Sequence, residues 1–270
     1  MASLRFFATG YPATVTDIGK YSTSEESRNP STACGFGRME RVSAPPRVST
    51  EADSVNPNPS RPILIRRLRR RDLPAGTIAL ARFLIGKVIV RELPSGRVAG
   101  RIVETEAYPP RDPAAHHFRG PTPRNRSMFL RRGHAYVYFT YGNHFMLNVS
   151  SEVPGIGGGV LIRALEPTEG IAQMEQNRQT TQLLDLTRGP GRLASALQID
   201  RRIDGVDLCA PGPLWLGAVS GLHNPNGGEK FLARRLGVSP RIGITRAAHR
   251  LLRFYERGNR FVSGSARHRA

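Results

Sequence analysis

The chain has 270 residues, of which 39% are hydrophobic, and its 40 basic and 21 acidic residues give a formal net charge of +19. This length allows one large domain or two small ones with a sizeable core. The sequence has no run of about 18 or more apolar residues, which excludes a typical transmembrane helix. The first residues lack the continuous apolar stretch of a secretory signal, so we expect neither secretion nor membrane insertion.

The positive charge is concentrated after residue 61. Residues 1–61 hold seven basic and six acidic residues, a net charge of +1, which leaves +18 for residues 62–270. A folded region this basic points to a polyanionic partner, most simply nucleic acid. The alternative is a charge-biased surface without a binding site, as in a ribosomal protein.

Residues 1–61 are rich in Ser, Thr, Pro, Gly and Asn and show no sustained hydrophobic periodicity. Such a segment predicts a disordered or poorly ordered tail, or an over-long assigned start. The two cysteines, Cys34 and Cys209, lie far apart, and the seven histidines form no HExxH motif. We therefore expect a reducing compartment, no metal and no cofactor.

Hydrophobic patterning predicts one domain over residues 62–270. Its first half is expected to contain a helix over 78–84, strands over 87–93 and 97–108, a long polar loop over 109–133, and a hairpin of strands 135–140 and 144–149. The second half is expected to contain a strand over 159–167, a helix over 167–178 with Thr168 as its N-cap, a helix after Gly189-Pro190-Gly191, strands over 213–219 and 241–245, and a closing segment over 251–263. This order predicts an α+β domain with a curved antiparallel sheet, flanking helices and a protruding β-hairpin.

The segment RIVETEAY, residues 101–108, places two carboxylates and a tyrosine on one predicted strand. Because side chains alternate along a strand, Glu104, Glu106 and Tyr108 should share one face. A solvated face is the ordinary explanation of such a pattern. The Arg-rich loop that follows favours a functional face, since loops this long inside a compact domain are usually functional or disordered.

Four of the seven tyrosines fall in this strand and in the predicted hairpin, at positions 108, 136, 138 and 141. Tyr136 is expected to pack in the core, as aromatic residues in strands usually do. Tyr141 falls at the hairpin turn, where packing rarely requires an aromatic ring. An exposed aromatic there, surrounded by arginines, is suited to act as a wedge in a nucleic-acid stack.

Five segments, in this order and spacing, resemble the alkyladenine (3-methyladenine) DNA glycosylase family. They are RIVETEAY (101–108), AAHHFRGPTPRNRSMF (114–129), AYVYFTYGNHFMLNV (135–149), VLIRALEP (160–167) and LTRGPGRL (186–193). The resemblance extends from about Ile65 to Ser263. It implies a metal-free enzyme that flips an alkylated or deaminated purine out of duplex DNA and hydrolyses its N-glycosidic bond.

The resemblance implies a role for residues of the first three segments. Glu106 matches the general base of the family. Tyr108, His116 and Tyr138 match the pocket that sandwiches and orients the extruded base. The residues are suited to this chemistry, because a carboxylate can deprotonate a water and stabilise the positive charge of an oxocarbenium-like state.

Three further roles follow from the same resemblance. Tyr141 matches the intercalating tyrosine, Asn148 the pocket residue that disfavours normal guanine, and Arg163 a residue that contacts DNA near the flipped nucleotide. The hairpin departs from the usual family pattern at Asn143 and at Phe145, which affects the wedge and the pocket floor.

Outside these assignments, we interpret Glu104 as an ion-pair partner of one of the many arginines and His117 as an ordinary structural histidine. The enzyme is expected to be monofunctional, because Lys87 and Lys230, the lysines of residues 62–270, fall outside the segments assigned to the site. The expected partner is double-stranded DNA with damaged purines, bound by a monomer without membrane contact. The expected location is the cytoplasm near the nucleoid in a bacterium, or the nucleus in a eukaryote.

Two other functions fit parts of the sequence. One is a non-catalytic nucleic-acid-binding module of similar fold, like a tRNA-recognising domain of a formyltransferase, but a pure binder does not need Glu106. The other is a polysaccharide glycosidase that uses Glu104 and Glu106 as paired acids. The net charge of +18 argues against it, and carboxylates this close on one strand face would not straddle a sugar ring.

Overall fold

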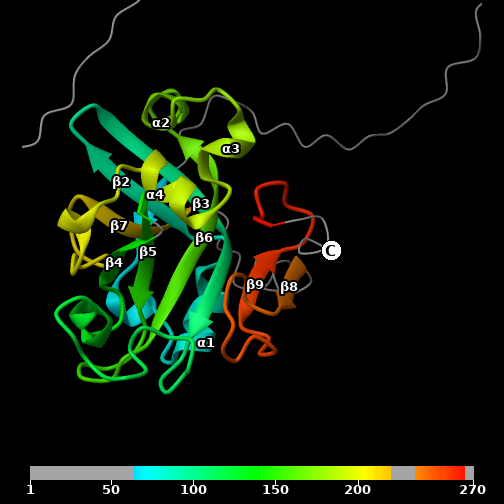
Figure 1. Ribbon diagram of the computed structural model, residues 1–270. Helices are drawn as coiled ribbons and strands as arrows, with labels where there is room; N and C mark the ends of the chain where they lie inside the picture. The colour runs from blue at the N-terminus through cyan, green and yellow to red at the C-terminus, as the bar shows by residue number, and fades with distance from the viewer. Residues whose placement is uncertain (1–63, 141, 220–234, 265–270) are drawn as a thin grey trace, which may run out of the picture. The chain divides into compact units, whose positions relative to one another are not determined.

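A nine-stranded antiparallel sheet organises the described residues, 64–140, 142–219 and 235–264, of the computed structural model (Figure 1). The strands are β1 (Ile65–Arg67), β2 (Val88–Leu93), β3 (Gly96–Tyr108), β4 (Ala135–Thr140), β5 (His144–Ser150), β6 (Gly159–Glu169), β7 (Leu214–Val219), β8 (Leu236–Ser239) and β9 (Arg253–Glu256). The helices are α1 (Thr77–Leu84), α2 (Ile171–Arg178), α3 (Leu183–Thr187) and α4 (Pro190–Ala196), with 3-10 turns η1 (Arg70–Asp72), η2 (Arg126–Phe129) and η3 (Arg201–Ile203). The predicted α+β class is confirmed.

The long strand β3 lies in the interior of the sheet. The strand order is β1-β7-β2-β3-β6-β5-β4, with β9 pairing β3 and β8 pairing β9, and the sheet does not close. On one edge β3 pairs with β6, while its other edge pairs first with β2 and then, at Glu104–Glu106, with β9. The register of β3 against β6 shifts on both sides of Glu104. Both glutamates are therefore held by strands on either side.

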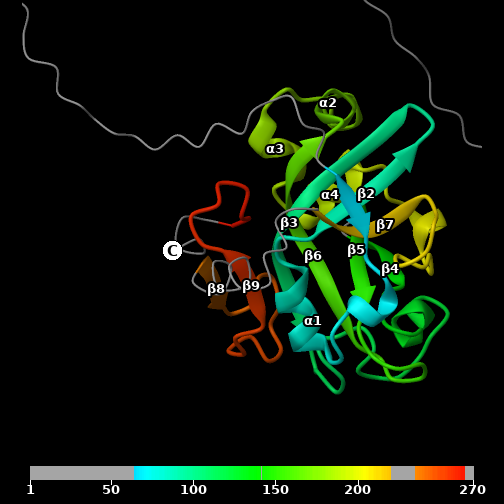
Figure 2. The same ribbon diagram turned by 180° about the vertical axis from the view of Figure 1, so that it is seen from behind.

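Helix α1 buries one face against the sheet. Its buried residues, Thr77, Leu80, Ala81 and Leu84, follow the i, i+3, i+4, i+7 spacing of an amphipathic helix. The hydroxyl of Thr105 in β3 donates a hydrogen bond of 3.0 Å to the backbone oxygen of Ala81. Seen from behind, α1 lies in front of the sheet (Figure 2), whereas α4 lies on the opposite side, in front of β5 and β6 in Figure 1. The sheet thus separates two helical layers.

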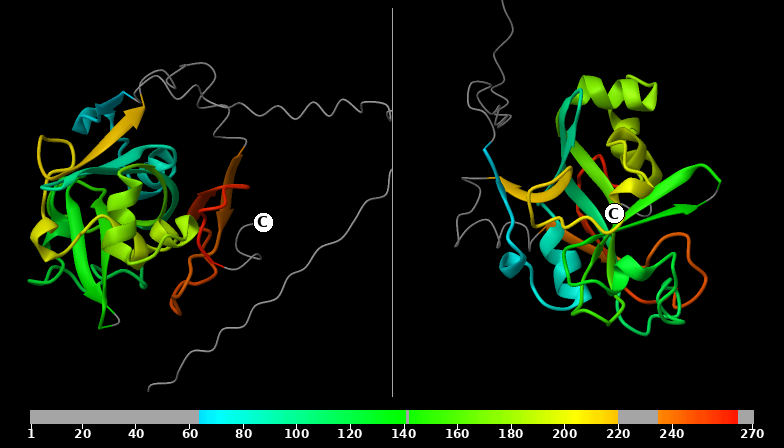
Figure 3. Two further views of the ribbon diagram at one scale, coloured as in Figure 1. Left: turned by 90° about the horizontal axis from the view of Figure 1, so that it is seen from above. Right: turned by 90° about the vertical axis from the view of Figure 1, so that its left-hand side faces the viewer.

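The hairpin of β4 and β5 projects from the sheet, as Figure 3 shows. Its register pairs Ala135 with Val149 and Thr140 with His144, which agrees with the predicted strands. The last described segment is held separately, by an apolar cluster of Val103, Ala164, Tyr255, Phe261 and Val262. This cluster fixes β9 and the residues after it beside the middle of β3.

Two predictions about local structure were wrong. Thr168 is not a helix cap, because pairing with β3 continues β6 through Glu169, and α2 follows Gly170. Gly170 takes φ of 71°, and a side chain there would also collide with the backbone oxygen of Arg97. Residues 241–245 form no strand in the structure. Their backbone and side chains instead serve the site described below.

The predicted tail, residues 1–61, lies outside the described residues, so its separation from the domain remains a prediction. Among the helices that the structure describes, none is long and apolar enough to cross a membrane.

Candidate active site

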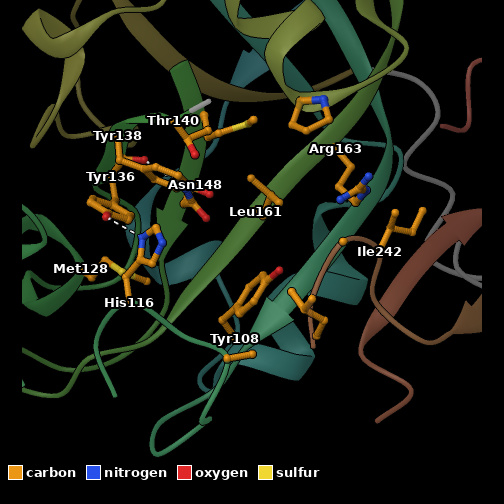
Figure 4. A pocket seen from close by; sticks show the side chains of 15 residues that line it. Tyr108, His116, Met128, Tyr136, Tyr138, Thr140, Asn148, Leu161, Arg163 and Ile242 are labelled. Atoms are coloured by element: carbon orange, nitrogen blue, oxygen red, sulfur yellow. Dashed lines mark hydrogen bonds between the residues drawn. The ribbon is translucent and has the colours of Figure 1, made fainter. Parts of the chain in front are cut away.

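A pocket of about 340 Å³ opens between the hairpin, β3, β6 and the segment after β8 (Figure 4). Its lining is aromatic on one side and mixed on the other. The lining residues are Tyr108, Ala114, His116, Met128, Tyr136, Tyr138, Thr140, Met146, Asn148, Leu161, Arg163, Pro190, Ile242, Gly243 and Ile244. Figure 4 shows His116, Tyr136 and Tyr138 on the side opposite Arg163 and Ile242, with Tyr108 between them.

The structure brings most of the predicted site residues to this one pocket. Five of the seven line it, namely Tyr108, His116, Tyr138, Asn148 and Arg163. Glu106 is fully buried and bonded to three lining residues, so it lies directly behind the pocket wall. Tyr141 lies outside the described residues, but the residue before it, Thr140, lines the pocket.

The carboxylate of Glu106 is held from three directions. Oε2 accepts a hydrogen bond of 2.9 Å from the hydroxyl of Tyr108. Oε1 accepts one of 2.7 Å from the backbone N–H of Ile242 and lies 3.2 Å from Nη1 of Arg163. A buried carboxylate is stable only with such partners. The alternative of a solvated face for RIVETEAY is excluded, because Glu104 and Glu106 are both fully buried.

Tyr108 connects this carboxylate to the pocket. The guanidinium of Arg241 lies 4.5 Å from the centre of the Tyr108 ring, a cation–π contact that fixes the ring. Arg241 is itself bound to the buried Asp112 at 2.8 Å. Burial, followed by the negative charge of Glu106, raises the pKa of the Tyr108 hydroxyl, so the hydroxyl remains protonated and donates to Glu106.

The aromatic wall consists of His116, Tyr136 and Tyr138. The Tyr136 and Tyr138 rings stack at a centroid distance of 5.3 Å, and the His116 ring meets Tyr138 edge-on at 4.4 Å. Nδ1 of His116 and the hydroxyl of Tyr136 are hydrogen-bonded at 2.9 Å. Partial burial of the ring and the positive charge of Arg124 lower the pKa of His116. The wall is therefore neutral near pH 7 and can stack on a flat ring.

Arg163 lies between two carboxylates. Its Nε is 3.1 Å from Oε1 of Glu104, and its Nη1 is 3.2 Å from Oε1 of Glu106. Burial acts to lower the pKa of Arg163, but the negative charges of Glu106 and Glu104 outweigh it and raise the pKa. The expected pairing of Glu104 with an arginine is observed twice, because Nε of Arg253 also lies 2.6 Å from its Oε1.

Asn148 and His117, the remaining residues discussed from the sequence, are both buried and each is hydrogen-bonded to a backbone oxygen. Asn148 is buried at the pocket, and its Nδ2 donates a hydrogen bond of 3.3 Å to the backbone oxygen of Tyr136. His117 is buried, with Nε2 at 3.0 Å from the backbone oxygen of Pro109. Among the described residues, no group of three or more His, Cys, Asp or Glu side chains is placed to hold a metal ion.

Three residues of the site are not predicted as site residues from the sequence. Tyr136 was assigned to the core, and it is buried, but its hydroxyl also reaches His116 in the pocket. The i, i+2 spacing from Tyr138 was the signal that could have found it. Arg241 and Ile242 were interpreted as part of a strand, and nothing in their local sequence indicates a contact with Glu106 or Tyr108.

The pocket combines aromatic faces that can stack on a flat ring with a buried carboxylate next to them. This combination is typical of an enzyme site rather than of a purely structural domain. The family model described as "Methylpurine-DNA glycosylase (MPG)" matches residues 72–260. The chain therefore belongs to the methylpurine-DNA glycosylase family.

Three relatives carry the name "Putative 3-methyladenine DNA glycosylase". The protein of Mesorhizobium japonicum is 63% identical over 197 residues, covering 73% of this chain and 90% of the relative. That of Paraburkholderia phytofirmans is 49% identical over 197 residues, covering 73% and 88%. That of the more distant Methanoculleus marisnigri is 43% identical over 187 residues, covering 69% and 93%.

Proposed function

We propose that this protein is a DNA glycosylase that flips an alkylated or deaminated purine out of duplex DNA and hydrolyses its N-glycosidic bond. The family description and the names of the relatives support a methylated purine as target. The single observation that carries the proposal is the fully buried carboxylate of Glu106 directly behind an aromatic pocket. The pocket volume of about 340 Å³ falls in the range of small-molecule sites.

The extruded base would lie between Tyr108 and the wall of His116, Tyr136 and Tyr138. Stacking on an aromatic face contributes about 1–3 kcal/mol per base. A damaged or mispaired base also costs less to extrude, which adds selectivity before any contact in the pocket. We assign Asn148 to rejection of normal guanine, because its amide group, held by the backbone oxygen of Tyr136, faces the pocket.

Glu106 would act as the general base. An ionised carboxylate offers about four lone pairs. Within the described part of the chain, Oε1 has two donors whereas Oε2 has one, the hydroxyl of Tyr108. A water on the remaining position of Oε2 would lose its proton to Glu106 as its oxygen bonds C1′ of the sugar. The electrons of the N-glycosidic bond leave with the purine, and the carboxylate stabilises the positive charge that develops on the sugar.

The rest of the chain would bind the duplex. Residues 62–270 carry a net charge of +18, suited to a phosphate backbone. We assign Tyr141, which follows β4 in the sequence, to the gap left by the extruded base. We assign Arg163, which lines the pocket, to contact with the flipped nucleotide. We expect the protein to act as a monomer.

The proposed reaction uses water and no amine. A bifunctional glycosylase needs an amine, typically a lysine, to form a Schiff base with the sugar. Lys87 lies 4.5 Å from the centre of the Phe83 ring in the α1 region, and Lys230 falls outside the described residues. Borohydride should therefore trap no covalent protein–DNA adduct during turnover.

The two competing functions have less support. A non-catalytic nucleic-acid-binding module has no use for a buried carboxylate behind its pocket. In a glycosidase with paired acids, the two carboxylates stand on opposite sides of the scissile bond. Here Glu104 and Glu106 contact the same guanidinium, that of Arg163.

The proposal is tested with a set of duplexes that each carry one defined lesion, either an alkylated or a deaminated purine. The duplexes are incubated with the full chain, abasic sites are cleaved with alkali, and the fragments are resolved. Fragments from at least one lesion, and none from the undamaged duplex, are expected. Binding of lesion duplex without base release from any member of the set would instead support the non-catalytic module.

A further inference from the structure

The second buried carboxylate of β3, Glu104, belongs to a network that the proposed reaction does not use. Its Oε1 accepts hydrogen bonds from Arg163 at 3.1 Å, from Arg253 at 2.6 Å and from the hydroxyl of Ser263 at 3.0 Å. Its Oε2 accepts one of 2.6 Å from the backbone N–H of Ser263. Three donors act on Oε1 and one on Oε2, and the carboxylate is fully buried and does not line the pocket, so we assign it no direct contact with the substrate.

This network is connected to the proposed base through one side chain. Arg163 contacts Oε1 of Glu104 and Oε1 of Glu106, and its guanidinium is almost completely buried. Arg253 is fully buried and contacts Glu104. Two carboxylates and two guanidinium groups thus form one buried cluster with a net charge of zero. Away from solvent, a change of one charge in the cluster is felt strongly by the others.

We infer that Glu104 is a positioning residue for Glu106 and acts through Arg163. A guanidinium bound to a single carboxylate strongly favours its charged form and makes it a weaker base. Because Glu104 shares Arg163, the guanidinium orients Glu106 while part of its charge is balanced elsewhere. The inference rests on the proposed function, since it assigns Glu104 a part in the same reaction.

The segment around Ser263 completes the network. Ser263 provides two of the four donors to Glu104, and its backbone oxygen accepts a hydrogen bond of 3.2 Å from Arg253. The neighbouring Phe261 and Val262 pack in the apolar cluster with Val103 of β3. Packing of this segment therefore holds Glu104 in place. Through Arg163 it also holds the carboxylate of Glu106, the proposed general base.

The test uses the sign of a shift in the pH–rate profile. The charged or titratable groups around Glu106 are Arg163 from β6, Tyr108 from its own strand with the Arg241–Asp112 pair on its ring, and Arg253 and Glu104 through the network. The Arg241–Asp112 pair is unchanged in every variant of this test. Glu104→Gln removes one negative charge and leaves the cluster positive, so the acid limb of the profile should move to lower pH. Arg253→Gln removes one positive charge, so the limb should move to higher pH. Each shift should be on the order of one pH unit, and the double variant should return toward the wild-type profile.

Single-turnover excision with saturating enzyme separates chemistry from folding. The rate constant then reports the reaction, and thermal unfolding of each variant reports whether it is folded. The matched control is Glu256→Gln, because Glu256 is a buried carboxylate of β9 that pairs with Arg101 at 2.6 Å. Thermal unfolding should show a loss of stability for this control, and its acid limb should stay in place.

Breaking a buried ion pair can prevent folding, so Ser263→Ala is included as a milder variant. It removes the hydroxyl donor to Glu104 and leaves every charge unchanged. Glu104 should then interact more strongly with Arg163, which leaves less of the guanidinium charge for Glu106. The acid limb should then move slightly to higher pH. Limbs that stay in place in all folded variants, with rate constants within about twofold of wild type, would overturn the inference and leave Glu104 as a structural residue. An inactive wild-type protein would instead contradict the proposed function itself.

Discussion

The hydroxyl of Tyr108 donates a hydrogen bond of 2.9 Å to Oε2 of Glu106, two residues earlier on the same strand. The ring of the same tyrosine forms part of the pocket, with Arg241 stacked on it. One residue therefore links the surface that would hold the base to the carboxylate that would activate water. Because both side chains leave β3 on one face, their separation is set by the pleat of the strand.

Tyr108→Phe should separate these two roles. The variant keeps the ring and its contact with Arg241 but loses the donor to Glu106. A hydrogen bond to a charged group contributes about 1.5–3 kcal/mol, so the single-turnover rate should fall by about 10- to 150-fold. Affinity for lesion duplex should stay nearly unchanged, as measured by fluorescence anisotropy. Tyr108→Ala, which also removes the ring, should weaken binding as well, and equal affinity losses in both variants would contradict this division.

Glu106→Gln should abolish most of the chemistry while leaving binding intact. The substitution keeps the size of the side chain and its acceptor for Tyr108, but removes both the base and the negative charge. General-base assistance alone is worth about 10²–10⁴ in rate, and the lost electrostatic stabilisation adds to it. Glu175→Gln on α2 is the matched control and should excise at the wild-type rate. A Glu106→Gln enzyme with near wild-type activity would show that another group is the base.

Tyr141→Ala should impair excision from duplex more than from single strands. The proposed wedge matters only where a stack must be filled after the base leaves it. The comparison uses the same lesion in both substrates, under single-turnover conditions. Phe139→Ala is a useful control, because Phe139 is an exposed aromatic residue of the same hairpin. Equal losses on both substrates would assign Tyr141 to the pocket or to the fold.

The stability of the domain should fall as the pH falls below neutral. Burial, the largest cause, lowers the pKa of His117, so its folded-state value lies below that of the unfolded chain. The unfolded chain therefore takes up more protons as the pH falls through about 6.5, and unfolding becomes more favourable.

Thermal unfolding between about pH 7.5 and about pH 5.5 measures this effect. The drop in melting temperature should be smaller for His117→Gln than for wild type. His249→Gln, the same substitution at an exposed position, should retain the full drop. An equal drop in all three proteins would mean that protonation of His117 does not destabilise the fold.

The parts that could be predicted from the sequence depend on local patterns. The alternation in RIVETEAY and the turn residues Gly142 and Asn143 define β3 and the β4–β5 hairpin, because strand faces and tight turns are specified by neighbouring residues. The placement of Tyr108 beside Glu106 follows directly from this alternation. The clustering of the other pocket residues was expected from the family resemblance, not from the pattern itself.

The parts that could not be predicted depend on contacts distant in the chain. The donor from Ile242 to Glu106 spans 136 residues, and the donors from Ser263 to Glu104 span 159 residues. No local spacing indicates such a contact, and residues 241–245 have the alternation of a strand without forming one. The error at Thr168 has the same origin, because pairing with β3 extends β6 past the position where local sequence favours a cap.

The separation of 159 residues between Glu104 and Ser263 has a consequence for the newly made protein. Translation proceeds at about 5–20 residues per second, so Glu104 leaves the peptidyl transferase centre on the order of 10 to 30 s before Ser263 is added. For most of this time the carboxylate lacks at least three of its four donors, those of Arg253 and Ser263, and burying it would be costly. The middle of the sheet should thus stay open on the ribosome while α1 and the hairpin can already form. On this reasoning, base excision would begin only after synthesis has passed Ser263.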